Sequence, residues 1–132
     1  MTVLDASAAI DLLLDAPPFA TRIREHVLAA GAGMHAPHLL DVEVAQVLRR
    51  FILAGVLRID RAERAVERLE QLPITRYPHL ALLPRALDLR RNLTAYDAIY
   101  VALAEALEVP LLTRDAGMAR SARRLIEVIH IA

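Results

Sequence analysis

The stretch Thr2-Val3-Leu4-Asp5-Ala6-Ser7 decides the fold, because an apolar strand leads through one carboxylate into the start of a helix. The same order returns in Pro110-Leu111-Leu112-Thr113-Arg114-Asp115, an apolar run that ends on an acid before a helical segment. Strands that alternate with helices favour a parallel sheet covered by helices on both faces. The sequence therefore predicts an α/β protein, a three-layer α/β/α sandwich around a mostly parallel central sheet.

Working outward from these two stretches, hydrophobic periodicity and breaker residues predict the other elements. The expected strands are residues 2–4, 34–36, 74–77, 110–113 and 126–131, and the expected helices are residues 6–14, 19–30, 39–54, 61–72, 80–91, 94–107 and 116–125. Pro17-Pro18 should end the first helix, Gly55 should cap the third, and Asp60 should cap the start of the fourth. No repeat or linker interrupts this pattern, so residues 1–132 should form a single domain.

Composition narrows the chemistry that the protein can use. The chain is 56% hydrophobic but only 4% aromatic, which predicts a core of Leu, Val, Ile and Ala. Its 16 basic residues are all Arg and balance 16 acidic residues, so no global positive field attracts nucleic acid. The absence of Lys and Cys excludes Schiff bases, Walker A loops, thiol nucleophiles, disulfides and Cys-ligated zinc. Carboxylates, His, hydroxyls and Arg remain.

The chain shows no segment typical of export or membrane insertion. Met1-Thr2 provides no basic region and Asp5 interrupts the first apolar stretch, so we expect no signal peptide. The longest uncharged apolar stretches, such as residues 27–34, are too short to cross a bilayer. We therefore expect a soluble, cytoplasmic protein with no membrane partner.

Four carboxylates lie inside or at the end of apolar runs, where an unpaired charge is expensive to desolvate. They are Asp5, Glu43, Asp97 and Asp115. Taken singly, Asp5 and Asp115 also fit helix N-caps, and Asp97 fits the third position of a capping box that starts at Thr94. Glu43 fits a structural role least well, because its neighbours on a helix are apolar. These neighbours are Leu39, Leu40, Val44 and Val47.

Taken together, the four acids predict a metal site. Ligands of open parallel sheets bind at the carboxyl ends of the strands, and all four acids can project into such a crevice. Four close carboxylates repel one another unless cations compensate them. Oxygen ligands without His or Cys select Mg²⁺, with Mn²⁺ as a substitute. Such ions activate water and stabilise a leaving oxygen, which suits phosphodiester hydrolysis.

Four motifs contain these acids. They are V-L-D-A-S-A at 3–8, L-D-V-E-V-A-Q-V-L-R at 40–49, L-T-A-Y-D-A-I-Y-V-A-L-A-E at 93–105 and P-L-L-T-R-D at 110–115. In their order and approximate spacing they resemble the PIN-domain family, and within it the VapC-type toxin ribonucleases of bacterial toxin–antitoxin pairs. The resemblance covers essentially the whole chain.

The resemblance implies roles for particular residues and for partners. Asp5, Glu43, Asp97 and Asp115 would form the acidic quartet that binds Mg²⁺ and positions water. The hydroxyls that match the family positions beside these acids are those of Ser7, Thr94 and Thr113. The resemblance also implies an RNA substrate, a homodimer, and a cognate antitoxin protein whose C-terminal segment occupies the groove.

Arginine is the residue best suited to hold RNA phosphates, and Arg114 is the strongest candidate because it precedes Asp115. The Arg pairs at 49–50, 90–91 and 123–124 fit phosphate contacts and solvated helix ends about equally well.

Two other kinds of side chain fit structural roles better than functional ones. His35 and His38 flank Ala36-Pro37 and are expected to be surface histidines rather than metal ligands. Tyr100, one turn beyond Asp97, is expected in the core or in the wall of a groove.

The leading hypothesis is a Mg²⁺-dependent endoribonuclease that acts as a growth-inhibiting toxin. The alternative is a catalytically silent PIN-fold protein-binding module, although such a module has no reason to retain four desolvated acids. A third hypothesis is a phosphatase or phospho-acceptor domain with an aspartyl nucleophile. The absent Lys and the lack of a D-x-D pair after the first strand both oppose it.

Overall fold

A five-stranded parallel sheet forms the centre of the protein, whose computed structural model describes residues 1–132. The strand order is β3-β2-β1-β4-β5, and every neighbouring pair is parallel. The strands are β1 (Thr2–Leu4), β2 (Met34–Pro37), β3 (Ile74–Tyr77), β4 (Leu111–Thr113) and β5 (Val128–His130). The predicted parallel sheet is therefore confirmed.

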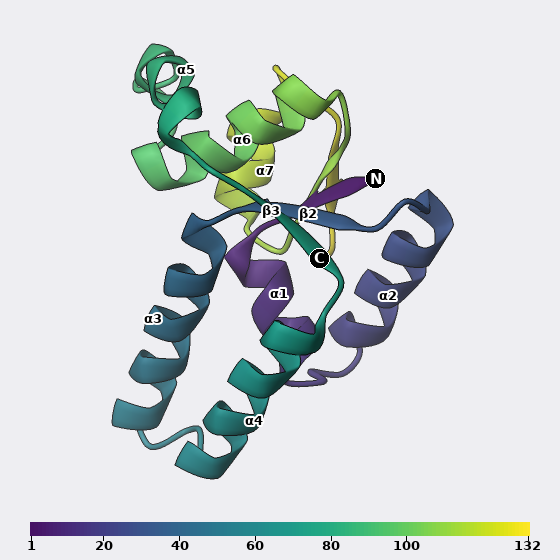
Figure 1. Cartoon of the computed structure of the whole chain (residues 1–132), viewed down its shortest axis with the longest axis vertical. Helices are drawn as coiled ribbons and strands as arrows, with labels where there is room; N and C mark the ends of the chain where they lie inside the picture. Colours follow the sequence, from purple (N-terminus) through teal and green to yellow (C-terminus); the bar gives the residue numbers. More distant parts are fainter.

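Helices cover both faces of this sheet, as Figure 1 shows, with α1 to α4 on one side and α5 to α7 on the other. The helices are α1 (Ala6–Leu13), α2 (Phe19–Ala30), α3 (Leu39–Leu53), α4 (Ile59–Gln71), α5 (Leu83–Asp88), α6 (Ala95–Leu107) and α7 (Ala116–Ala122), with a short 3-10 helix, η1 (Leu80–Leu82). The three-layer α/β/α arrangement matches the prediction. None of these helices is both long and apolar enough to span a membrane.

The core lies on both sides of the central strands β1 and β4. Val3, Leu4, Leu111 and Leu112 are fully buried, as expected for parallel strands that are covered on two faces. Aliphatic and Ala side chains make up nearly all of the core cluster, and Tyr100 is its one aromatic member. This agrees with the composition, which is rich in aliphatic residues and poor in aromatic ones.

Several predicted element boundaries shift in the structure. The helix predicted over residues 80–91 is divided into η1 and α5, with Pro84 in the first turn of α5. Gly55 lies one residue beyond the C-cap of α3, with a left-handed φ of 74° that glycine adopts readily. The last helix and the last strand are shorter than predicted.

The cap predicted at Asp60 is wrong. Helix α4 starts at Ile59, its N-cap is Arg58, and no side chain caps it. Asp60 lies inside the first turn, where its carboxylate accepts a hydrogen bond from Nε of Arg58 at 3.1 Å. A carboxylate in a first turn is still favourable, because it faces the positive end of the helix dipole.

The surface position predicted for His35 is also wrong. His35 lies within β2 and is only 6% exposed. Its Nδ1 is 2.7 Å from the hydroxyl of Tyr77, and its Nε2 is 3.2 Å from the carbonyl oxygen of Ala32. The strand predicted over residues 34–36 is present, but its burial depends on pairing with β3, which no local pattern indicates. His38, in contrast, is exposed as predicted.

Candidate active site

Asp5 connects β1 to α1 and is almost completely buried, at 4% exposure. Its Oδ1 accepts hydrogen bonds from the Ala8 amide at 3.0 Å and from Oγ of Ser7 at 2.7 Å. Its Oδ2 accepts a hydrogen bond from Oγ1 of Thr113 at 2.5 Å. Burial raises the pKa of Asp5 above its ordinary value, although these three hydrogen bonds oppose the rise. Asp5 is thus both a helix cap and a carboxylate held rigidly at the sheet edge.

Asp115 follows β4, the strand next to β1, and lies at the same carboxyl edge of the sheet. Its Oδ1 caps α7 by accepting a hydrogen bond from the Met118 amide at 3.0 Å. Its own amide donates to Oγ1 of Thr113 at 3.0 Å. The buried Thr113 hydroxyl therefore joins Asp115 to Asp5, and Oγ of Ser7 lies 3.3 Å from the same hydroxyl. Unlike Asp5, Asp115 is exposed.

Asp97 lies in the first turn of α6, and its amide donates to Oγ1 of Thr94, the N-cap, at 3.2 Å. Its side chain is half-buried and accepts no hydrogen bond from the protein. Burial first, and then the negative charges of Asp115, Asp5 and Glu43, raise the pKa of Asp97 to about 6. Since all three charges act on Asp97, the structure brings the four acids into one region, as the sequence predicts.

Glu43 projects from α3 on the opposite side of the sheet from α6. The Tyr100 hydroxyl, on α6, donates a hydrogen bond to its Oε1 at 2.6 Å. Tyr100 is 1% exposed, which confirms that it is a core or groove-wall residue. Burial and this hydrogen bond to Glu43 raise the pKa of the tyrosine hydroxyl. Sequence reasoning missed this bond, although the helical spacing of Tyr100 from Asp97 already placed its ring on the same side of α6.

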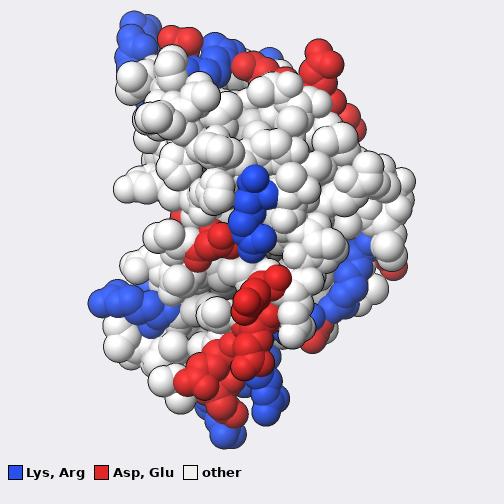
Figure 2. Space-filling model, in the orientation of Figure 1, with Lys and Arg blue, Asp and Glu red and all other residues white.

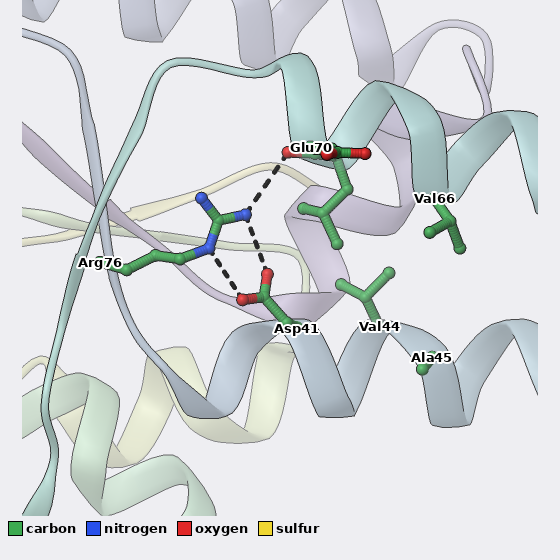
Figure 3. Close-up of a pocket in the computed structure, with 7 residues that line it drawn as sticks. Asp41, Val44, Ala45, Val66, Glu70 and Arg76 are labelled. Carbon is green, nitrogen blue, oxygen red and sulfur yellow. Dashed lines mark hydrogen bonds and ion pairs between the residues drawn. The ribbon is translucent and has the colours of Figure 1, made fainter.

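None of the four acids has an arginine or histidine nitrogen within 4.0 Å, because the ion pairs of the protein all use other carboxylates. Asp41, two residues before Glu43 on α3, is one of these others. Its two oxygens bind Nε and Nη2 of Arg76 at 2.8 and 2.9 Å (Figure 3). Figure 2 shows acidic atoms in a hollow at the left edge of the molecule, between the parts that carry α6 and α3.

The donor set fits a hard cation in charge and in atom type, since it consists of carboxylate and hydroxyl oxygens. As the side chains stand, however, no three Asp, Glu or His residues lie close enough together to hold a metal ion. The effect of the other three charges on the pKa of Asp97 is compatible with this spacing, because charges interact over longer distances than the distance from a ligand to a metal ion. Asp97, whose carboxylate makes no hydrogen bond, is the acid that can turn toward an ion without breaking one.

Arg114 contributes to this region through its backbone rather than through its guanidinium. Its amide donates to Oγ of Ser7 at 2.9 Å. Its Nε binds Asp11 at 2.5 Å, its Nη1 lies 3.3 Å from the carbonyl oxygen of Ile131, and its guanidinium covers the ring of Phe19 at 3.3 Å. These contacts engage the side chain in the fold and oppose the predicted RNA contact. Sequence reasoning gave Asp11 and Phe19 no role in this contact.

The chain is similar over almost its whole length to one family of proteins. The family profile described as PIN domain matches residues 2–124, which include all four acidic positions. Ribonuclease VapC9 of Mycobacterium tuberculosis (strain H37Rv) is 43% identical over 115 residues, or 87% of this chain and 86% of that protein. Ribonuclease VapC12 of M. tuberculosis (strain CDC 1551) is 37% identical over 132 residues, or 100% of both chains.

Solved structures share the fold at lower sequence identity. PAE2754 from Pyrobaculum aerophilum has a TM-score of 0.69 and 23% identity, and the match covers 96% of this chain and 82% of that one. VapBC2 from Rickettsia felis, bound to a DNA fragment from its promoter, has a TM-score of 0.65 and 10% identity, with coverage of 98% and 97%. Both matches support the three-layer arrangement described above.

Proposed function

Because the chain belongs to the PIN-domain family, and within it to the VapC ribonucleases, we propose that it is a Mg²⁺-dependent endoribonuclease and the toxin of a toxin–antitoxin pair. Its relatives at 37% and 43% identity carry ribonuclease names. The cluster of oxygen ligands suits Mg²⁺, with Mn²⁺ as a substitute.

One observation supports the metal dependence more than any other: Asp5, Glu43, Asp97 and Asp115 share a region, and none of them has an arginine or histidine nitrogen within 4.0 Å. Elsewhere in the protein, carboxylates of comparable exposure have arginine partners, as Asp11 and Asp41 do. Carboxylates that repel one another in partly buried surroundings call for a counterion, and no basic side chain of the protein forms an ion pair with these four. A divalent ion meets that need.

The four acids have two kinds of task in this proposal. Asp5, Asp97 and Asp115 would hold the ion, which supplies an activated water and stabilises the departing oxygen of a phosphodiester. Thr113 and Ser7 hold the oxygens of Asp5 in place. Because the Tyr100 hydroxyl occupies Oε1 of Glu43, Oε2 is free either to complete the metal shell or to orient the attacking water.

The pKa of Asp97 also bears on the working pH. With a pKa of about 6, its carboxyl group is largely protonated below that pH and cannot bind a cation well. At limiting Mg²⁺, cleavage of RNA should therefore increase as the pH rises through about 6. The approach of a cation would lower the pKa of Asp97 and assist this ionisation.

The partners follow from the family rather than from a contact in the structure. The protein would act on RNA, bind a cognate antitoxin protein, and function as a homodimer in the cytoplasm. Light scattering tests the dimer, and a mass equal to one chain would contradict it. A catalytically silent binding module is the alternative, and the retained, uncompensated acids oppose it.

RNA cleavage with matched variants tests the proposed function. Total RNA is incubated with wild type, with Asp97→Asn, or with Asp60→Asn as the control, and the new 5′ ends are sequenced. Wild type and the control should cut RNA at the same positions with Mg²⁺, and EDTA should stop the cleavage by both. Asp97→Asn should be slower by at least about 100-fold. Equal cleavage by wild type and Asp97→Asn would show that Asp97 is not catalytic. If folded wild type does not cleave RNA at all, the result favours the catalytically silent binding module.

A further inference from the structure

Most arginines of the protein have partners in the fold. Arg24, Arg58, Arg68, Arg76, Arg85 and Arg114 form ion pairs, and Arg22, Arg61 and Arg90 donate to backbone carbonyls. Seven arginine side chains form no hydrogen bond or ion pair. Three of them are Arg49 and Arg50 on α3 and Arg64 on α4, and the other four form a group. The members of this group are Arg91, Arg120, Arg123 and Arg124.

The group of four comes from two parts of the chain that the fold brings together. Arg91 precedes α6, whereas Arg124 follows α7, yet both line one hollow of about 300 Å³. Asn92 and Ser121 line the same hollow and add neutral donors. Its only carboxylate is that of Asp88, which lies 3.8 Å from Nη1 of Arg85. The hollow therefore presents unpaired guanidinium groups beside amide and hydroxyl donors.

Such a donor set suits the phosphates of a nucleic acid backbone. Guanidinium groups and Asn and Ser side chains all donate hydrogen bonds to phosphate oxygens. Because the net charge of the whole chain is zero, attraction for RNA has to come from a local basic surface of this kind.

Two segments of the chain connect the hollow to the acidic site: the residues before α6, and α7, which Asp115 caps and whose later residue Ser121 lines the hollow. Arg91 and Asn92 are followed by Thr94, which caps the helix that carries Asp97. On α7, a Cβ added to Gly117 would lie 3.3 Å from Oδ1 of Asp115 and 4.0 Å from Nη2 of Arg120. The Arg120 guanidinium thus lies near Asp115, and Ser121, the next residue of α7, lines the hollow.

We propose that Arg91, Arg120 and Arg124, together with Asn92 and Ser121, bind the phosphates of the RNA strand that continues beyond the cleaved bond. This proposal rests on the proposed ribonuclease function and adds the path of the substrate. Arg120 contacts the phosphate nearest to the acidic site, and the hollow holds the next part of the strand. Single-stranded RNA is the partner that fits, because its phosphates repeat along an extended backbone and can pair in succession with Arg120 and the arginines of the hollow.

The same chemistry on α3 lacks this placement and provides a matched control. Arg49 and Arg50 are also exposed and unpaired, but they lie in the later half of α3, away from its N-terminal turns where Glu43 lies. Replacing them changes the net charge of the protein by the same amount as replacing Arg91 and Arg124. Any difference between the two double variants therefore reports position rather than total charge.

The test compares Arg91→Gln/Arg124→Gln with Arg49→Gln/Arg50→Gln in an Asp97→Asn background, in which cleavage should be at least about 100-fold slower. Fluorescence anisotropy with a labelled single-stranded RNA of random sequence measures affinity at several salt concentrations. The Arg91/Arg124 variant should bind about 10-fold more weakly, and its salt slope should fall by about 1.4, or 0.7 for each lost phosphate contact. The control should bind as its parent does. Circular dichroism checks that both variants fold.

Other outcomes overturn the proposal in distinguishable ways. Equal RNA affinity and salt slope for both double variants would refute the phosphate path, while leaving the nuclease function intact if wild type still cuts RNA. Binding of labelled polyglutamate is measured in the same way. If the Arg91/Arg124 variant loses affinity for polyglutamate but keeps its affinity for RNA, the surface binds an acidic protein instead. Failure of wild type to cleave any RNA would refute the proposed function, and the path with it.

Discussion

The acidic site and the pocket between α3 and α4 both receive a carboxylate from α3, but only the pocket provides a counterion. In the pocket, which measures about 450 Å³, Arg76 binds Asp41 through two nitrogens and also reaches the carbonyl oxygen of Leu69 on α4 (Figure 3). In the site, Glu43 has only the neutral hydroxyl of Tyr100. Asp41 therefore stabilises the packing of α4, whereas Glu43 belongs to a charge cluster that calls for a ligand.

The largest expected difference is in RNA cleavage, between the variants in which one or the other of the two acids of α3 is replaced by its amide. Glu43→Gln should lower RNA cleavage by about 100-fold, because it removes a charge that would bind the ion or orient water. Asp41→Asn should leave cleavage per folded molecule within about threefold. Initial rates with Mg²⁺ measure both. Similar losses of cleavage rate in the two variants would show that the acidic site and the pocket between α3 and α4 do not differ in function.

Tyr100→Phe should have a smaller effect on the same reaction. The change keeps the buried ring but removes the hydroxyl that fixes Oε1 of Glu43, so kcat should fall about 10-fold while KM stays the same. Tyr96→Phe is the control, because Tyr96 is 61% exposed and far less buried. A variant that unfolds more easily but keeps kcat would show that the hydroxyl serves stability alone.

Arg76→Leu should change stability rather than activity. The side chains of Arg76 and Asp41 are 24% and 39% exposed, so solvent screens the pair and its loss should cost about 1–2 kcal/mol. Arg58→Leu breaks the more exposed pair with Asp60 and should cost almost nothing. Urea unfolding measures both free energies. A large loss of cleavage in folded Arg76→Leu would connect the pocket to the chemistry.

The smallest effect concerns the metal-free protein. The folded pKa of Asp97, about 6, lies above its ordinary value of 3.8, so the folded state binds this proton more tightly than the unfolded state. The stability that Asp97 contributes is complete below about pH 3.8 and disappears as the pH rises through about 6. In EDTA, Asp97→Asn should therefore gain about 1 kcal/mol over wild type between about pH 5 and pH 8, after allowance for solvent screening. Unchanged relative stability would contradict the charge cluster.

The elements of the fold were largely predictable because local patterns determine them. Apolar runs that end on Asp5 and near Asp115 identified two central strands, and the prolines and glycines marked most helix ends. The exceptions depend on long-range partners. His35 is buried because β3 pairs with β2 and Tyr77 meets its ring, and no local pattern indicates either contact.

That the four acids lie in one region was predictable, but the contacts that they make there were not. The four acids stood out because each interrupts an apolar run. The bond from Tyr100 to Glu43 and the capture of Arg114 by Asp11 and Phe19 join residues far apart in sequence. The sequence also could not show that Asp41 is paired and Glu43 is not. The partner of Asp41 is Arg76, which lies on β3, far from α3 in the sequence.

The most direct test of the account is the effect of Mg²⁺ on the melting temperature of wild type, Asp97→Asn and Asp41→Asn. At a concentration of about 100 times Kd, a ligand of the folded state adds about 2.7 kcal/mol, which for 132 residues raises Tm by on the order of 10 °C. Wild type and Asp41→Asn should both show this rise over NaCl of equal ionic strength, and Asp97→Asn should not. No rise in wild type, or an equal rise in Asp97→Asn, would contradict the claim that the four acids bind a divalent ion as a unit.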